Sequence, residues 1–329
     1  MLFRDYILYW YQTYKEPVQE LNTAAVNLCY LRVHVVPSSL GQKELSVIRT
    51  HDIQEFLADL LLQGNRCPIK SINTYGKPLS RWTVNRIRQL LIAALNSAVK
   101  EGLIPFNCAV DTTSIPLPIS TVTPFTVDEQ QIFLSHTRNH RFYVAYLLYF
   151  YTGCRRGEIL GLSWSAVHWS KDCILITQTL IMENGAPKLK LKHAKTPKSI
   201  RAIPIPKDIK IRLHEWKRQQ NQEKSQYKGW HNPNDLIFTQ KNGEPVNPAT
   251  FSASFKRKAI RLGLPSHLHL NCTRHSWTTN MVQMNIPISD IQAMGGWSRP
   301  DVLLRIYAQT VQKSQKKAIN RLYKEYPPI

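Results

Sequence analysis

Four residues that lie far apart in the chain, Arg155, Lys195, Arg274 and Tyr307, are of the types needed to break a phosphodiester without a metal ion. Such a reaction needs cations that neutralise the pentavalent transition state, a nucleophile, and an acid that protonates the leaving oxygen. Arginine suits the first task, because its planar guanidinium holds two phosphate oxygens and stays charged near neutral pH. Tyrosine can supply the nucleophile and lysine the acid. A fold that brings these residues together could break and rejoin DNA.

The charge of the chain favours double-stranded DNA as the partner. The sequence has 43 basic and 22 acidic residues, a formal net charge of +21 and a pI near 9.8. Residues 1–115 hold 12 Lys/Arg and 9 Asp/Glu, whereas the remainder holds 31 and 13, so the C-terminal part carries most of the attraction for a polyanion. We expect no membrane partner, because no apolar run reaches the roughly 18 residues that span a bilayer and the N-terminus lacks a signal-peptide pattern.

The cysteines predict neither a disulfide framework nor a metal site. Their scattered spacing, without a CxxC pair, is typical of a protein of the reducing cytoplasm. The group formed by His267, His269, Cys272 and His275 has unsuitable spacing for a closed zinc site. The six residues are Cys29, Cys67, Cys108, Cys154, Cys173 and Cys272.

The elements that must position the reactive residues fall into two predicted domains. Residues 1–110 read as a small helical bundle, with apolar residues at three- and four-residue spacing in His51–Leu62 and Ser80–Lys100. Residues 111–125 are rich in proline, serine and threonine and predict a linker. A second domain is expected over 126–329, opening with a hydroxyl cap and acidic residues in the first helical turn.

The second domain is predicted to be mainly α-helical with a small antiparallel β-sheet, so the whole chain belongs to the same mainly α class. The last third shows no further convincing strand. The predicted elements are helices over Phe142–Tyr151 and Arg155–Leu162, a strand over Cys173–Met182, a turn over Glu183–Ala186, an alternating segment over Lys188–Lys192, a short strand over Arg201–Ile205, and a helix from Asp208 that a polar stretch interrupts over Gln219–Asn234.

Five short segments, in this order and spacing, resemble the tyrosine recombinase or phage integrase family, most closely the integrases of conjugative transposons and temperate phages. The resemblance covers nearly the whole chain, and the separations Arg274 to Trp297 and Trp297 to Tyr307 are typical of the family. It implies a helical core-binding (SAM-like) DNA-binding domain followed by a mixed α/β catalytic domain. The segments are Thr152-Gly153-Cys154-Arg155-Arg156-Gly157-Glu158, Lys195-Thr196 with Ser199 and Arg201, Thr273-Arg274-His275, Gly295-Gly296-Trp297, and Tyr307.

The resemblance gives Arg155 and Arg274 the role of phosphate-binding arginines. Arg155 is expected in the first turn of a helix, and its neighbour Arg156 is the alternative if the local turn differs. Glu158 is expected to support the site from the same helix, with an ordinary surface ion pair as the alternative. Lys195, in a loop between two strand-like segments, resembles the general acid. Other lysines nearby could instead occupy that role or contact phosphates, namely Lys190, Lys192 and Lys198.

Three further residues complete the implied site. Asn271 stands three residues before Arg274, where the family usually has a histidine; its amide can donate to a phosphate oxygen but cannot accept the proton of a tyrosine. His269 is interpreted as structural, because residues two apart face different sides of a helix. Trp297 can donate its indole N–H to the phosphate or serve in the core. Tyr307, on a helix capped by Ser298, is the implied nucleophile.

The resemblance further implies a cycle with a 3′-phosphotyrosyl intermediate and a Holliday junction, carried out by a homotetramer on two duplexes, with a dimer on each site. No cofactor is implied, because bond energy is conserved. Accessory DNA-bending proteins, a mobile element as substrate, and a bacterial, nucleoid-associated, cytoplasmic location complete the expectation. The helical pattern starts near Met1, which predicts a simpler recombinase or a chain lacking an N-terminal arm-binding domain. Alternatives are relaxation of the type IB topoisomerase kind, or a catalytically silent DNA-binding regulator, because Pro287–Tyr307 resembles a helix-turn-helix.

Overall fold

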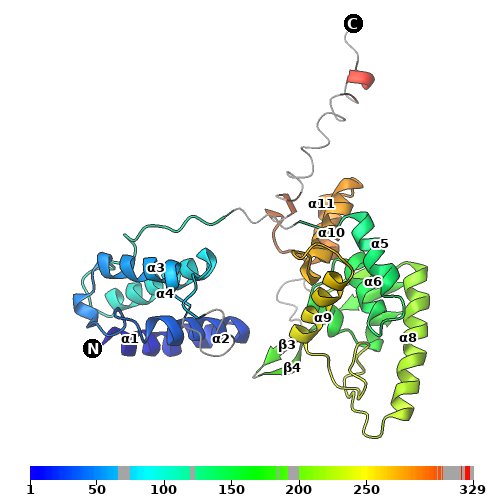
Figure 1. The fold of residues 1–329 in the computed structure, drawn as a ribbon, viewed down its shortest axis with the longest axis horizontal. Helices are drawn as coiled ribbons and strands as arrows, with labels where there is room; N and C mark the ends of the chain where they lie inside the picture. Colours follow the sequence, from blue (N-terminus) through cyan, green and yellow to red (C-terminus); the bar gives the residue numbers. More distant parts are fainter. Residues whose placement is uncertain are drawn as a thin grey trace. The chain divides into compact units, whose positions relative to one another are not determined.

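The chain divides into two compact units, Met1–Ser120 and Thr121–Ile329, in the computed structural model (Figure 1). The structure describes residues 1–65, 75–118, 123–183, 185–191, 200–301, 303–304, 306, 320 and 323–326. Within these residues, no helix is both long enough and apolar enough to cross a membrane.

The first unit is a helical bundle, as the apolar spacing predicts. Ser80 caps its longest helix by accepting a hydrogen bond from the backbone N–H of Thr83. Two of the helices continue into π-helical turns at their C-terminal ends. The elements are α1 (Phe3–Trp10) with its turn Tyr11–Lys15, a 3-10 turn (Glu16–Val18), α2 (Leu21–Tyr30) with its turn Leu31–Val35, a second 3-10 turn (Leu45–Val47), α3 (Thr50–Gln63) and α4 (Arg81–Lys100).

Aromatic side chains of α1 tie the first unit together. Tyr6 donates to the carbonyl of Ala94, and the indole of Trp10 donates to Ser97, so both hydrogen bonds reach α4. Thr112 and Ile115, at the start of the predicted linker, lie buried in the same unit, whereas Phe125 is buried in the core of the second.

The second unit is built around α6, whose side chains are almost all buried. Phe133 of α5 and Phe255 of α9 pack against it, with ring centroids 4.4 Å apart. Thr126 and Glu129 form a capping box at the start of α5, which confirms the predicted helix start. The helices are α5 (Val127–His136), α6 (Tyr143–Thr152), α7 (Arg156–Leu160), a 3-10 turn (Trp164–Ala166), α8 (Lys207–Gln226), α9 (Pro248–Arg261), α10 (Leu270–Gln283) and α11 (Ile288–Gly295).

The predicted interruption over Gln219–Asn234 is wrong in its first part, because α8 continues to Gln226. Gln220 is buried on the core side of this helix. Its amide donates to the carbonyls of Leu236 and Ile237 and accepts from the indole of Trp164. A buried glutamine therefore stands where the helical pattern would have an apolar residue, so the sequence did not indicate that the helix continues.

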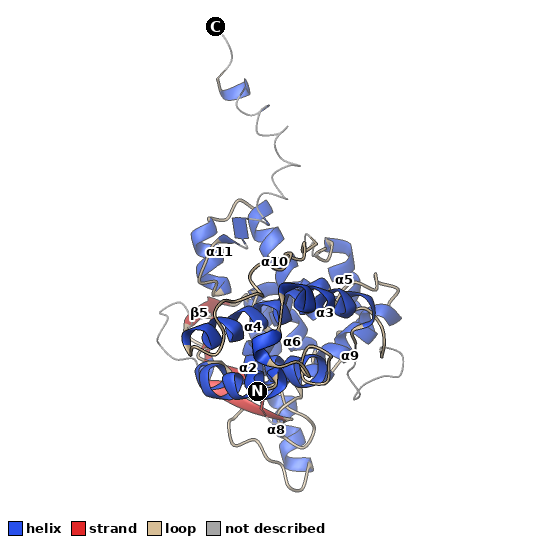
Figure 2. Ribbon diagram, turned by 90° about the vertical axis from the view of Figure 1, so that its left-hand side faces the viewer, coloured by secondary structure: helices blue, strands red, loops and turns tan. Residues whose placement is uncertain are grey.

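The fold class is confirmed, although the strands form two small antiparallel sheets rather than one (Figure 2). The predicted strand Cys173–Met182 divides at Thr177 into β2 and β3. β2 lies between β1 and β5, with Ile174 opposite Ile203, whereas among the described strands β3 pairs with β4 alone, with Leu180 opposite Leu189. The strands are β1 (Val167–His168), β2 (Cys173–Ile176), β3 (Gln178–Glu183), β4 (Ala186–Leu191) and β5 (Arg201–Pro204).

Candidate active site

Arg155 lies at the junction between α6 and α7. Gly153 ends α6 in the left-handed conformation, with a φ of 62°. Arg155 is the N-cap residue of α7 and has an extended backbone, so the prediction that it lies in the first turn is wrong. The backbone N–H of Arg155 donates to Oε2 of Glu158 at 2.8 Å, and Nη1 donates to Oε1 at 3.1 Å. Half of the Arg155 side chain stays exposed, so it can meet a ligand.

Arg274 comes from α10 and reaches the same place. Its Nη1 donates to the carbonyl of Gly153, and its Nη2 donates to the carbonyl of Gly295 at 2.8 Å. The guanidinium lies over the ring of Trp297, 3.7 Å from the centroid. Burial, followed by the nearby charge of Arg155, lowers the pKa of Arg274 to about 9, so the group remains charged at neutral pH.

Trp297 supports the guanidinium of Arg274 from the apolar side of the site. Its ring stacks on Trp277, with centroids 6.3 Å apart, and packs in a small apolar cluster that includes Ile291 and Leu303. Leu303 belongs to the stretch that leads to Tyr307. The predicted packing role of Trp297 therefore agrees with its contacts, while hydrogen bonding to a phosphate stays a prediction.

A third guanidinium, that of Arg201, completes the arrangement from β5. Its Nη2 and Nη1 donate to the two oxygens of Glu158 at 2.8 and 3.2 Å, and its Nε donates to the carbonyl of Met294 at 2.6 Å. Arg201 is 8% exposed and Glu158 is 1% exposed. The alternative in which Glu158 makes an ordinary surface ion pair is therefore wrong. We call Arg155, Arg201, Arg274 and Glu158 the arginine cluster.

The C-terminal end of α11 serves as a shared acceptor for the arginine cluster. Three successive carbonyls, those of residues 294, 295 and 296, accept from Arg201, Arg274 and Arg155 respectively. The last carbonyls of a helix lack intrahelical partners and carry partial negative charge, so guanidinium groups bind there favourably. Gly296 has a φ of 67°, and an added Cβ would lie 2.8 Å from Nη1 of Arg201, so this position needs glycine.

The arginine cluster carries surplus positive charge. Within the described part of the chain, the carboxylate that pairs with these guanidiniums is that of Glu158, which bonds Arg155 and Arg201. A bound anion would relieve the repulsion between Arg155 and Arg274. The arrangement suits a phosphate, because guanidinium groups can donate parallel hydrogen bonds to its oxygens. Among the described residues, no group of three or more His, Cys, Asp or Glu side chains could hold a metal ion.

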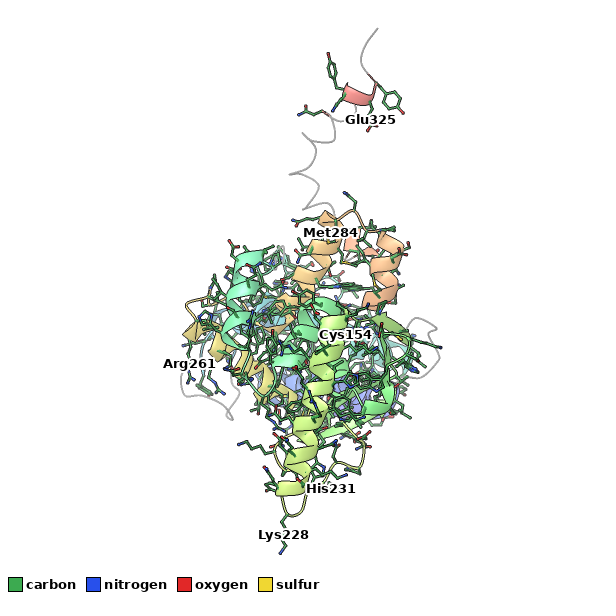
Figure 3. All side chains as sticks on the ribbon, turned by 90° about the vertical axis from the view of Figure 1, so that its right-hand side faces the viewer. Cys154, Lys228, His231, Arg261, Met284 and Glu325 are labelled. Atoms are coloured by element: carbon green, nitrogen blue, oxygen red, sulfur yellow. The ribbon has the colours of Figure 1, made fainter. Side chains whose placement is uncertain are left out.

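Two other side chains beside the arginine cluster carry a nucleophilic group but are poorly suited to attack a phosphate. Cys154 precedes Arg155 in the body of the second unit (Figure 3), and burial followed by the charge of Glu158 raises the pKa of its thiol to about 11. Tyr149 donates its hydroxyl to the carbonyl of Arg156, and burial raises its pKa well above the ordinary value. Both groups stay protonated at neutral pH.

The remaining predicted residues are placed as follows. Asn271 is exposed in the first turn of α10. It stands three residues before Arg274, so the two residues are neighbours on the surface of this helix. His269 is the N-cap residue of α10, with Nδ1 2.7 Å from Sγ of Cys272. Arg156, the alternative to Arg155, donates instead to Ser252 of α9 at 2.9 Å. Lys195 and Tyr307 lie outside the described residues, as do Lys192 and Lys198.

The sequence profile of the Phage integrase family matches residues 125–314, which is more than half of the chain. The chain belongs to the phage integrase family. It is accordingly a tyrosine-type recombinase, an enzyme class that breaks and rejoins DNA strands, as the motifs predict. The match spans the arginine cluster and the position of Tyr307.

Individual relatives in this family support the assignment. The chain is 26% identical to a XerC-like tyrosine recombinase of Caldanaerobacter subterraneus, over 89% of this chain and 75% of that protein. It is 24% identical to the ICEBs1 integrase of Bacillus subtilis, over 74% of this chain and 66% of that protein.

Solved structures of phage integrase relatives share the fold. A structure of the Tn1549 transposon integrase in complex with transposon right end DNA has a TM-score of 0.80 at 18% identity, covering 98% of this chain and 99% of that chain. A lambda integrase tetramer bound to a Holliday junction has a TM-score of 0.66 at 15% identity, covering 93% and 77%.

The sequence motifs include Arg201 but predict no role for it. The signal was the position of a basic residue at the start of a strand with buried neighbours, since Ile203 and Ile205 are both buried. The three carbonyls at the end of α11 have no signal in side-chain types, although the pair Gly295-Gly296 marks a close approach of backbone.

Proposed function

We propose that this chain is a site-specific DNA recombinase that integrates and excises a mobile element. The observation that carries the proposal is the pair Arg155 and Arg274, held beside each other by backbone carbonyls and left with surplus positive charge. Such a pair suits the two non-bridging oxygens of a scissile phosphate.

The proposed reaction conserves phosphodiester bonds. The hydroxyl oxygen of Tyr307 gives up its proton to solvent and attacks the phosphorus, forming a 3′-phosphotyrosyl bond as the bond to the 5′ oxygen breaks. Lys195 donates a proton to that leaving oxygen, which becomes a 5′ hydroxyl. A 5′ hydroxyl of the partner duplex then attacks the phosphotyrosine, restoring a phosphodiester and freeing Tyr307. No nucleotide or metal cofactor enters this sequence of steps.

Asn271 and Trp297 are proposed to assist by hydrogen bonding to the phosphate. Asn271 follows the N-terminus of α10 and is exposed, so its amide can donate to a phosphate oxygen. A carboxamide does not titrate near neutral pH, so Asn271 is not assigned the proton of Tyr307. Trp297 is held by stacking on Trp277, which restricts the orientation of its indole.

The proposed assembly has two protomers on each site and four on two duplexes, passing through a Holliday junction. The lambda integrase tetramer bound to such a junction supports this proposal through its shared fold. The unit Met1–Ser120, which contains the predicted domain 1–110, is proposed as the core-binding DNA-binding domain. We place the protein in the bacterial cytoplasm, associated with the nucleoid and with accessory DNA-bending proteins.

A suicide duplex with a nick near the cleavage site tests the proposal, because loss of the short fragment traps the covalent intermediate. Wild-type protein is expected to give an SDS-resistant adduct on its own site, and Tyr307→Phe none. An adduct with Tyr307→Phe would refute the assignment of the nucleophile, and absence of a wild-type adduct would indicate a catalytically silent regulator. Comparing plasmid relaxation on one duplex with two-site recombination separates this function from that of a type IB topoisomerase.

A further inference from the structure

We propose that Arg201 is a positioning residue for DNA cleavage, which fixes Arg155 through Glu158 and fixes the acceptor end of α11 through the carbonyl of Met294. The inference rests on the proposed function, because it concerns the rate of the same cleavage step.

The first connection runs from Arg201 through Glu158 to Arg155. Both carboxylate oxygens are shared, since Oε1 accepts from Nη1 of each arginine, and Oε2 accepts from Nη2 of Arg201 and the backbone N–H of Arg155. Glu158 is almost fully buried, so its orientation depends on these donors. Arg201 therefore decides where the carboxylate holds the half-exposed Arg155.

The second connection runs from Arg201 through α11. The 2.6 Å hydrogen bond to Met294 fixes the first of three consecutive carbonyls. The next two carbonyls, of Gly295 and Gly296, hold Arg274 and Arg155. A shift of the Met294 carbonyl would move both acceptors, because they belong to the same backbone. Arg201 thus influences both phosphate-binding arginines without needing to touch the phosphate.

The contacts require arginine and exclude lysine as an equivalent. Three nitrogens of one planar group reach two carboxylate oxygens and a carbonyl in different directions. Burial alone would lower the pKa of Arg201, but hydrogen bonding and attraction to Glu158 outweigh burial and raise it. A lysine ammonium would keep the charge and lose the simultaneous contacts.

Arg201→Lys is the decisive variant, and Arg141→Lys is its matched control. Arg141 also bonds one carboxylate, Glu223, and two backbone carbonyls, of Thr239 and Gln240, within the same unit. Single-turnover cleavage of the suicide duplex at saturating DNA is measured per folded protein, together with DNA affinity. Arg201→Lys is expected to lower the cleavage rate about 10- to 100-fold with affinity changed less than about 3-fold, whereas Arg141→Lys leaves both unchanged.

A double-mutant cycle with Arg155→Lys separates positioning from a merely structural role. Because Arg201 acts partly through Arg155 and partly through Arg274, adding Arg201→Lys to Arg155→Lys is expected to lower the rate by less than the product of the two single losses. Independent, multiplicative losses would overturn the inference, as would a wild-type rate in Arg201→Lys. Absence of any wild-type adduct would refute the proposed function instead, so the two failures are distinguishable.

A charge-neutral pair keeps the test decisive if Arg201→Lys does not fold. Arg201→Met combined with Glu158→Leu removes both buried charges together, which a folded core tolerates better than loss of one. The folded double variant is expected to bind DNA and to cleave it at least about 10-fold more slowly than wild type, because Arg155 loses its supporting contact. Cleavage at the wild-type rate would overturn the inference.

Discussion

Two arginine sites in the second unit use the same contacts but differ in charge balance. Arg141 bonds Glu223 and the carbonyls of Thr239 and Gln240, and its guanidinium lies 5.0 Å from the ring centroid of Trp216. The arginine cluster also combines a carboxylate, carbonyls and an indole, but there Glu158 bonds two guanidiniums, and carbonyls and the Trp297 ring hold the third, that of Arg274.

The difference separates an arginine that stabilises the fold from arginines that are kept ready for an anion. At Arg141 one guanidinium faces one carboxylate, that of Glu223, so the charges balance without a ligand. In the arginine cluster the backbone carbonyls orient guanidiniums without neutralising them, and the surplus charge remains available for a phosphate. Three pairs of substitutions and one single substitution test this distinction.

The largest expected effect is on cleavage. Arg274→Ala should lower the single-turnover rate of adduct formation about 10²- to 10³-fold, because it removes one of the donors that stabilise transition-state charge. Arg141→Ala should leave the rate per folded protein unchanged while lowering stability. Equal losses of cleavage in both variants would show that the two sites do not differ in function.

The next effect is on stability. Glu158→Gln should lower the free energy of unfolding by roughly 3 kcal/mol, because it leaves buried Arg201 without its counterion. Glu223→Gln is the control, and its loss should be smaller, since the Arg141 and Glu223 side chains retain 16% and 18% exposure. Denaturant unfolding measures both values, and a larger loss for Glu223→Gln would contradict the prediction.

A smaller effect distinguishes two left-handed glycines. Gly296→Ala should lower the free energy of unfolding by about 2 kcal/mol or more, because backbone strain adds to a contact between the new methyl group and Arg201. Gly263→Ala, at a φ of 74° with open space around it, should cost only about 1 kcal/mol. The excess for Gly296 measures its packing on Arg201, and equal losses would argue against that packing.

The smallest effect is a pH dependence of the free energy of unfolding that arises at His140, the residue before Arg141. Burial, followed by the charge of Lys258, lowers the pKa of the neighbouring His140 to about 4, below its ordinary value of 6.5. Folding favours the neutral imidazole, so this contribution is fully present above pH 6.5 and is lost as the pH falls towards 4. Linkage between these two pKa values gives about 2 kcal/mol between pH 7 and pH 5, which solvent screening of the half-buried imidazole reduces to about 1 kcal/mol. The difference between unfolding at pH 7 and at pH 5 should therefore be about 1 kcal/mol larger in wild type than in His140→Phe. An unchanged difference would refute this origin.

The sequence predicted the helices and the arginine pair better than it predicted how they are held. Arg155 and Arg274 follow from short motifs, and α3, α4 and α5 follow from periodicity and caps. The bond between Arg201 and Glu158 joins residues 43 positions apart, and charged residues ordinarily lie at the surface, so local pattern gave no reason to bury them.

The division of the predicted strand at Thr177 was hidden for a related reason. β2 and β3 are consecutive and similar in composition, and only their partners distinguish them. β3 pairs with the strand that follows it, whereas β2 pairs with β5 beyond that hairpin, so a continuous β pattern did not reveal two sheets.

The consecutive carbonyls at the end of α11 have a consequence for how mutations act there. An alanine scan would change the side chain of Met294 yet leave its carbonyl oxygen, so the contribution of this position to the site would pass almost unnoticed. Inserting or deleting a single residue between Ile291 and Trp297 would instead assign every carbonyl to the wrong arginine. Substitution of Met294 is therefore expected to lose apolar packing but keep the acceptors, whereas a change in length would displace them.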